Sequence, residues 1–176
     1  FNYLSAPAAT VADIRAVIQK AKDNLISSNV KIILFIDEIH RFNRAQQDVL
    51  LDDVEKGVLI LIGATTENPY FAINSPLISR STVFEFTSLN KNDIVELLKR
   101  ALKDSKRGLG TLDIRASEDA LEYIAIMSDG DARKALTALE IGVMSQKNTG
   151  AKVIKFDLET AKESIQQKSI VFDPTG

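Results

Sequence analysis

Residues 31–42 read KIILFIDEIHRF, and this stretch decides the expected fold. Five apolar residues in a row, residues 32–36, run directly into two adjacent carboxylates, Asp37 and Glu38. An all-apolar run is typical of a parallel strand that is buried on both faces of a sheet. In open α/β sheets, ligands bind beyond the carboxyl ends of the strands. The two acids therefore mark a candidate binding site at the end of a buried strand.

The neighbouring segments alternate between strand and helix patterns. Thr10 lies three residues before Asp13, which is the spacing of a helix-capping box, and apolar residues then recur at helical spacing as far as Asn29. A second helix is expected over residues 44–55, with Gly57 ending it. Strands are expected over residues 1–6, 32–36, 58–62 and 82–86. This order predicts a doubly wound parallel sheet.

From about residue 88 onward, the sequence changes to a run of helices. Asn90 and Ser117 are placed to begin two of them, and further helices are expected over residues 132–146 and 156–167. The basic loop between the first two reads SKRGLG. We therefore expect two domains, residues 1–87 and residues 88–168, followed by a linker over residues 169–176.

Composition excludes several classes of protein and site. The chain has 176 residues, no cysteine and a single histidine, so disulfides, thiolate metal sites and multi-histidine metal sites are excluded. A net charge of -2 gives no overall attraction to nucleic acid. No apolar run reaches the roughly 20 residues that cross a bilayer. The start at Phe1, without a signal peptide or an initiator Met, is what a fragment or a processed chain would show, and a cytosolic protein is expected.

The two strand-end acids suit different tasks in phosphoryl transfer. Asp37 is placed to hold Mg²⁺, which prefers oxygen ligands, and Glu38 is placed to orient an attacking water. An apolar strand followed by Asp-Glu is the Walker B signature. Taken alone, the stretch is also compatible with a strand that ends in a solvated acidic turn.

Three further segments offer side chains for a phosphate or a water. Arg80 precedes the expected strand at residues 82–86, and its guanidinium matches phosphate oxygens. Arg133, with Lys134 beside it, opens a helix, where a cation opposes the helix dipole at a cost of about 0.3–1 kcal/mol. Polar side chains follow the strand at residues 58–62, namely Thr65, Thr66 and Asn68. Each segment alone also fits an ordinary turn or a solvated surface.

Together and in this order, these motifs resemble a known family. DEIHRFNRAQQDVLL, IGATTENPYF, LISRSTVFEF, RGLG and SDGDARKALTALE are similar to the bacterial MgsA/RarA proteins, where RarA is replication-associated recombination protein A. Their eukaryotic relative is the Werner helicase-interacting ATPase. These are clamp-loader-like AAA+ ATPases that act at replication forks and in recombination, and the resemblance covers almost the whole chain.

The resemblance implies a role for each candidate residue. Asp37 matches the Walker B acid that binds Mg²⁺, and Glu38 matches the catalytic glutamate. Thr65 best matches sensor 1, with Thr66 and Asn68 as alternatives that also line the nucleotide site. Arg80 matches the arginine finger of the clamp-loader SRC motif, although Ser81 replaces its Cys. Arg133 matches sensor 2. His40 belongs to the family's DEIHRF string, but no catalytic step requires it, so a structural role is expected.

The phosphate-binding half of such a site is absent from the sequence. None of the eight glycines belongs to a G-x-x-x-x-G-K-[ST] P-loop. The implied fold is therefore α/β, a partial AAA+ core that lacks the central P-loop strand, followed by a small all-α lid domain. The strand at residues 82–86 should then have no neighbour, and the final linker should lead to a C-terminal oligomerisation domain that is absent here. We expect ATP and Mg²⁺ to be cofactors of the full-length protein and the isolated fragment to be inactive.

The resemblance also implies partners and a location. The expected partners are forked DNA, single-strand/duplex junctions and replication proteins such as single-strand binding protein. The expected assembly is a homotetramer, and the expected location is the cytoplasm at the nucleoid, with no membrane association. The DNA-binding residues cannot be read from the sequence, since the cluster of Lys103, Lys106 and Arg107 also fits a solvated loop. Two alternatives stay open: a clamp-loader or Holliday-junction branch-migration subunit, and a non-catalytic scaffold at the fork. An intact Asp37–Glu38 pair argues against the scaffold.

Overall fold

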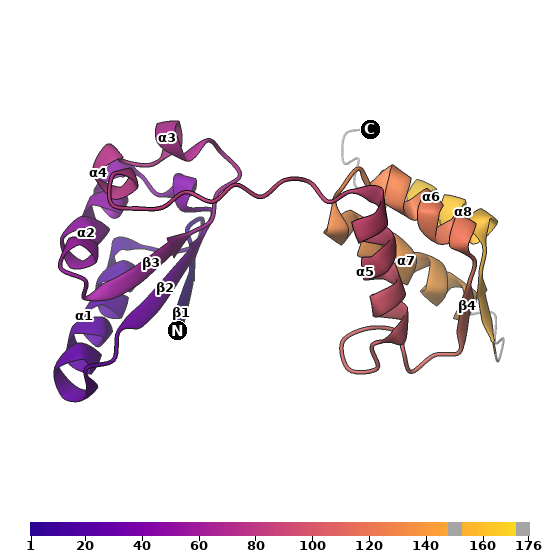
Figure 1. Cartoon of the computed structure of the whole chain (residues 1–176), viewed down its shortest axis with the longest axis horizontal. Helices are drawn as coiled ribbons and strands as arrows, with labels where there is room; N and C mark the ends of the chain where they lie inside the picture. Colours follow the sequence, from indigo (N-terminus) through magenta and orange to yellow (C-terminus); the bar gives the residue numbers. More distant parts are fainter. Residues whose placement is uncertain (148–152, 172–176) are drawn as a thin grey trace. The chain divides into compact units, whose positions relative to one another are not determined.

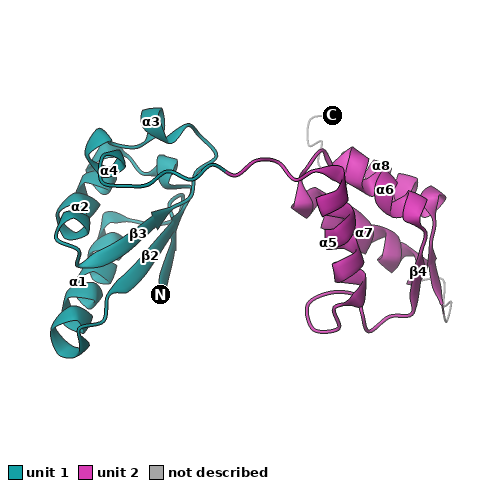
Figure 2. Cartoon of the chain, viewed as in Figure 1, with its two compact units in different colours: residues 1–85 teal, residues 86–176 magenta. Residues whose placement is uncertain are grey.

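The computed structural model describes residues 1–147 and 153–171, with side chains as far as residue 166. The chain divides into two compact units, Phe1–Glu85 and Phe86–Gly176 (Figure 2). This division lies two residues before the expected boundary between residues 87 and 88. Of the expected linker at residues 169–176, the first three residues belong to the last helix, which ends at Val171, and the remainder lies outside the described residues.

A parallel three-stranded sheet organises the first unit (Figure 1). Its strands lie side by side in chain order, and the bounds are β1 Asn2–Ser5, β2 Ile32–Asp37 and β3 Leu59–Gly63. Leu34 in the middle strand pairs with Asn2 on one side and with Leu61 on the other. The expected parallel α/β arrangement is confirmed for these three strands.

Two helices with locally encoded ends connect the strands. Helix α1 (Val11–Ser28) begins at a capping box between Thr10 and Asp13 and ends at Asn29, whose left-handed φ of 53° closes the helix. Helix α2 (Arg44–Glu55) has the bounds expected from the sequence, with Asn43 and Gln46 as its capping box. Both helices pack on the same side of the sheet (Figure 1), where the core contains Ile14, Ile18, Leu34, Ile36, Leu50 and Leu59.

The opposite face of the sheet is exposed, contrary to the expectation that both faces are covered. Side chains alternate along β2, so that Leu34 and Ile36 are buried whereas Ile33 is 36% exposed. On the same face of the neighbouring strands, Tyr3 is 55% and Ile60 is 47% exposed. An apolar sequence shows that both faces are suited to burial, but it does not supply a covering layer. The first unit therefore presents an apolar sheet face to solvent.

The expected strand at residues 82–86 is not formed. After two single-turn helices, α3 (Pro69–Ala72) and α4 (Ser75–Ile78), residues 82–90 are exposed and have neither helical nor strand structure. Phe84 is 78% and Phe86 is 95% exposed. A strand needs a partner to accept and donate its ladder hydrogen bonds. Within the described residues, no strand pairs with this segment, which is consistent with the expected lack of a neighbour.

The second unit is a helical domain with its own core (Figures 1 and 2). Its helices are α5 Lys91–Lys103, α6 Glu118–Ser128, α7 Ala132–Lys147 and α8 Leu158–Val171. The unit also contains two short parallel strands, β4 (Ile114–Ala116) and β5 (Ile154–Phe156), so the expectation of an all-α domain missed a small sheet. Phe156 from β5 is fully buried against α7, where a Cβ on Gly142 would lie 2.5 Å from its ring.

In the part of the chain that the structure describes, none of the helices combines the length and apolar character needed to span a bilayer.

Candidate functional site

Asp37 is the last residue of β2, and its carboxylate lies on the exposed face of the sheet. The phenol of Tyr3, on the adjacent strand β1, donates a hydrogen bond of 3.1 Å to Asp37 Oδ2. The Tyr3 ring stacks on Phe35 with a centroid separation of 5.9 Å, which fixes the direction of the phenol. Asp37 is therefore held at the strand end by one neighbour and keeps its other carboxylate oxygen for a ligand.

Glu38 leaves the strand in a different direction because its backbone is left-handed, with φ 55° and ψ 43°. This conformation costs a non-glycine residue about 1–3 kcal/mol. The following 3₁₀ turn η1 (Ile39–Arg41) is closed by Arg41 N–H, which donates to the Glu38 carbonyl at 2.8 Å. Buried Ile39 and Phe42 anchor this turn in the core. The two adjacent acids consequently point to different places, as two separate roles require.

The end of β3 lies beside this turn. Ala64 N–H donates to the Ile36 carbonyl at 2.9 Å, and Ile39 N–H donates to the Ala64 carbonyl at 3.0 Å. Gly63 permits the close approach, because a Cβ there would lie 3.0 Å from Ile39 Cδ1. The backbone pairing of the two strands thus extends into the loops that carry Glu38 and Thr65.

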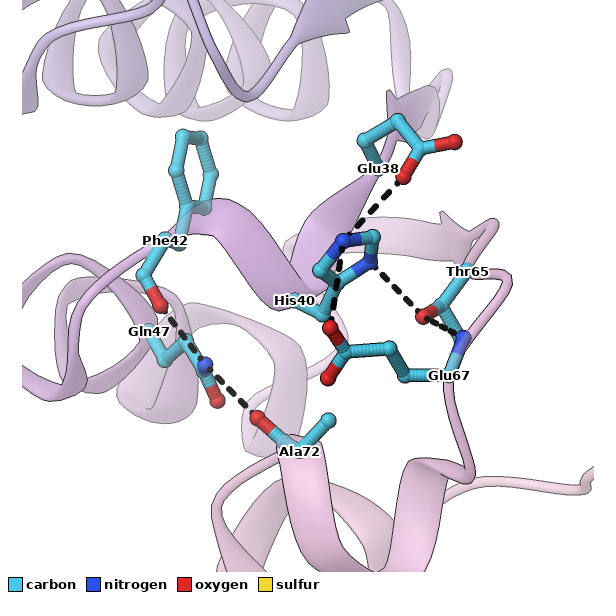
Figure 3. Close-up of polar contacts among 7 residues, drawn as sticks. All are labelled: Glu38, His40, Phe42, Gln47, Thr65, Glu67 and Ala72. Carbon is cyan, nitrogen blue, oxygen red and sulfur yellow. Dashed lines mark hydrogen bonds and ion pairs between the residues drawn. The ribbon is translucent and has the colours of Figure 1, made fainter.

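His40 brings residues from both strand ends together (Figure 3). Its Nδ1 lies 2.9 Å from Thr65 Oγ1, and its Nε2 lies 3.2 Å from Glu38 Oε2 and 3.7 Å from Glu67 Oε1. The His40 side chain is only 6% exposed. Sequence reasoning gave this residue no catalytic step, because the burial of its ring and its contact with Thr65 arise only in the folded chain.

The three candidates for sensor 1 have different surroundings. Thr65 Oγ1 contacts the His40 ring and accepts a hydrogen bond from Glu67 N–H at 3.0 Å. The Asn68 side chain instead caps α3 by accepting from Tyr70 N–H at 3.0 Å, and Thr66 is exposed. Among the described residues of this turn, Thr65 is the candidate that reaches the histidine and, through it, Glu38.

The buried side-chain amide of Gln47 forms hydrogen bonds with the backbone at the end of the η1 turn. Gln47, which is 2% exposed, donates from Nε2 to the Phe42 carbonyl at 3.0 Å and to the Ala72 carbonyl at 3.3 Å (Figure 3). Its Oε1 accepts from Asn74 N–H at 2.8 Å. These bonds satisfy three backbone groups that a buried apolar residue would leave unpaired. Gln47 therefore ties the end of the η1 turn to the segment that leads to Arg80.

Arg80 belongs to the first unit but contacts a different set of residues. Its Nη2 lies 3.0 Å from Glu55 Oε1 at the end of α2, and its Nη1 donates to the Pro76 carbonyl at 3.1 Å. The side chain is 40% exposed. Arg80 is thus held at the surface by partners outside the Glu38–His40–Thr65 group, a position that suits a residue directed at a neighbouring molecule.

Arg133 lies in the second unit, in the first turn of α7, and is exposed. Asp131 precedes this helix and accepts from Lys134 N–H through Oδ1 at 2.9 Å, which places a negative charge where the helix dipole favours it.

The residues present fit only part of a nucleotide and metal site. Within residues 1–147 and 153–171, no three or more acidic or histidine side chains are grouped to hold a metal ion. Mg²⁺ at nucleotide sites needs only one or two carboxylates, because phosphate oxygens and water supply the rest. Asp37 fits that single-carboxylate role. Glu38 also lines a surface hollow, together with Ala6, Pro7, Ala9, Arg41 and Gln46.

The Tyr3–Asp37 pair can be tested by titration. The hydrogen bond to Asp37, loss of hydration and the Asp37 charge together raise the pKa of the Tyr3 phenol above its ordinary value of 10.0. Because the pKa is raised on folding, the pair should contribute to stability below the unfolded pKa and lose that contribution as the pH rises through the folded pKa. Ultraviolet titration of Asp37→Asn should show one of the three tyrosines ionising at lower pH than before. Asp52→Asn, which removes the partner of Lys56, is the matched control, and an unchanged titration in Asp37→Asn would contradict the pairing.

Comparison with known proteins identifies the family. Residues 4–89 match the model of the ATPase family associated with various cellular activities (AAA), and residues 110–176 match the AAA C-terminal domain. Over its whole length, the chain is 42% identical in sequence to the replication-associated recombination protein A of Bacillus subtilis, and the matched segment is 41% of that protein. The Escherichia coli K12 protein of that name is 40% identical in sequence over 98% of this chain, and the matched segment is 38% of that protein. ATPase WRNIP1 of Dictyostelium discoideum is 39% identical over 99% of the chain, which corresponds to 22% of that protein.

Solved structures show the same fold. A mutant of RuvB from Thermotoga maritima matches 94% of this chain with a TM-score of 0.70 and 25% identity, over 52% of its own length. The RuvB Holliday junction branch migration motor of that organism matches with a TM-score of 0.71 and 24% identity, again over 94% of this chain and 52% of its own length. The chain spans about two fifths of the length of the bacterial relatives named above. It belongs to the RarA/MgsA family of AAA+ ATPases, to which ATPase WRNIP1 is related.

Proposed function

We propose that the full-length protein hydrolyses ATP and couples hydrolysis to DNA remodelling at replication forks and in recombination. The observation that carries this proposal is the pair of acids at the end of β2, with Glu38 turned away from Asp37 by its left-handed backbone and linked to Thr65 through the His40 ring. A scaffold without catalysis would have no use for this arrangement. The DNA substrate, the partner replication proteins, the tetramer and the nucleoid location are proposed from family membership.

Each site residue has one task in the proposed reaction. Asp37 would hold Mg²⁺, which supplies charge neutralisation to the phosphates when bound. The Glu38 carboxylate would accept a hydrogen bond from the attacking water and orient the water's lone pair toward the γ-phosphoryl group. The Thr65 hydroxyl would act as sensor 1, Arg80 would reach the nucleotide of the adjacent subunit, and Arg133 would contact the nucleotide of its own subunit.

Glu38→Gln in the full-length protein should separate catalysis from binding. The amide keeps the shape of the side chain but is a poor proton acceptor, so kcat should fall about 100-fold or more while ATP affinity is retained. Steady-state ATPase assays with and without forked DNA measure the first quantity, and equilibrium titration measures the second. Glu96→Gln is the matched control, since Glu96 is an exposed residue of α5 in the second unit, away from the end of β2. Full activity in Glu38→Gln would favour the non-catalytic scaffold.

Arg80→Ala should remove the proposed arginine finger. Such residues contribute about 10³–10⁵ to the rate of related phosphoryl transfers, so turnover should be almost lost while nucleotide binding persists. Glu55→Ala serves as the control, because it breaks the ion pair of 3.0 Å without removing the guanidinium. Mixing an excess of Arg80→Ala subunits with unaltered ones should lower activity per unaltered subunit if the finger acts between subunits. Unchanged turnover in Arg80→Ala would show that the assignment is wrong.

The 176-residue chain alone should bind ATP weakly and should not hydrolyse it. Its sequence contains the Walker B acids but no P-loop, whose backbone N–H groups and Lys cradle the phosphates. We expect calorimetry with Mg²⁺ and ATP to give a dissociation constant no tighter than about 1 mM. The full-length protein, measured in parallel, should bind far more tightly. Micromolar, Mg²⁺-dependent binding by the chain alone would contradict this prediction.

A further inference from the structure

His40 is the buried link between the proposed catalytic glutamate and the proposed sensor. Its ring contacts Glu38 from the end of β2 and Thr65 from the end of β3 (Figure 3). Among the described residues, it is the one hydrogen-bonding or ion-pairing partner that the Glu38 carboxylate has. That carboxylate is otherwise free to move, since 36% of the Glu38 side chain is exposed. Within the described residues, His40 is therefore the group that contacts the Glu38 carboxylate and can orient it.

The partners of the ring determine where its proton lies. A carboxylate only accepts hydrogen bonds, so Nε2, which faces Glu38 at 3.2 Å and Glu67 at 3.7 Å, must carry the hydrogen. The opposite tautomer would turn the Nε2 lone pair toward two carboxylate oxygens. In a neutral ring Nδ1 is then the acceptor, and the Thr65 hydroxyl, 2.9 Å away, must be the donor.

The same reasoning extends through Thr65. Its oxygen accepts from Glu67 N–H at 3.0 Å, and its single hydrogen is directed to His40 Nδ1. Hydrogen bonds therefore run from Glu67 N–H to Thr65 and from Thr65 to His40, and the Glu38 carboxylate lies at ion-pair distance on the other side of the ring. A change at Thr65 thus acts on the ring that Glu38 contacts.

We propose that His40 is a positioning residue for ATP hydrolysis, which sets the orientation of Glu38 relative to Thr65 through its two ring nitrogens. The ring is well suited to the task because it is buried on a turn whose ends are anchored by Ile39 and Phe42. Small displacements of a catalytic group can cost about 100-fold in rate, so a rigid link is useful. The kinetic part of this inference rests on the proposed ATPase function, whereas the contacts of the ring can be measured without it.

The ring contacts can be observed directly because His40 is the single histidine in the chain. In the chain labelled with ¹⁵N-histidine, two-dimensional NMR should show a single ring with a hydrogen on Nε2. Thr65→Val should shift the Nδ1 resonance and leave Nε2 protonated, whereas Glu38→Gln should shift mainly Nε2. Thr66→Val, at the adjacent exposed position, is the control and should change neither. An Nε2 without a hydrogen or an absent response to Thr65→Val would overturn the assignment.

Kinetics of the full-length protein test the positioning role. His40→Phe keeps a ring without its nitrogens and should lower kcat about 10- to 100-fold, with the KM for ATP changed less than about threefold. His40→Gln, whose amide can still donate toward Glu38, should recover part of the loss, and His40→Asn should recover less. Retained ATP affinity in each variant shows that the site is still folded.

The outcomes distinguish the two proposals. Full kcat in His40→Phe, or an effect confined to KM, would overturn the role of His40 and leave the ATPase proposal intact. Absence of hydrolysis by the unaltered full-length protein would instead overturn the proposed function. In that case the kinetic role of His40 is lost with it, although the NMR experiment still decides whether the ring links Glu38 to Thr65.

Discussion

The candidate site depends on the backbone pairing of β2 with β3. This pairing does not stop at the last strand residues, because Ala64 N–H donates to Ile36 and Ile39 N–H donates to Ala64. Parallel strands bring their carboxyl ends to the same edge, and these two bonds keep the departing loops together for several residues more. Glu38, His40 and Thr65 meet because the loops that carry them are hydrogen-bonded to each other. A shift of register between the two strands would separate the acids from Thr65.

Much of this fold follows from local sequence. The capping residues Thr10 and Asn43 and the left-handed Asn29 set the limits of α1 and α2, and each acts through contacts within a few residues. The position of Asp37 and Glu38 was predictable for the same reason, since both follow directly from an apolar strand. The family resemblance then supplied roles for Thr65, Arg80 and Arg133, which their own patterns did not establish.

The features that sequence reasoning missed depend on distant partners. Residues 82–86 have the composition of a strand, but a strand forms only beside another, and none of the described strands pairs with this segment. Strands β4 and β5 have three residues each, too few for a period of two to be seen, and they are stabilised by their mutual pairing. The contacts of His40 are similar, because Thr65 is 25 residues away and reaches the ring only when β3 lies beside β2.

The left-handed backbone of Glu38 has a consequence for selection. Glycine adopts this conformation without strain, so Glu38→Gly would remove a steric cost from the native state, although it would also give the unfolded chain more freedom. At this position the backbone geometry favours a residue that could contribute nothing to the proposed chemistry. Local folding preference and the proposed catalytic use thus oppose each other at a single site, as in other stability–activity trade-offs. A glutamate at this position, against its own backbone preference, is what selection for the proposed activity, rather than for stability, would leave.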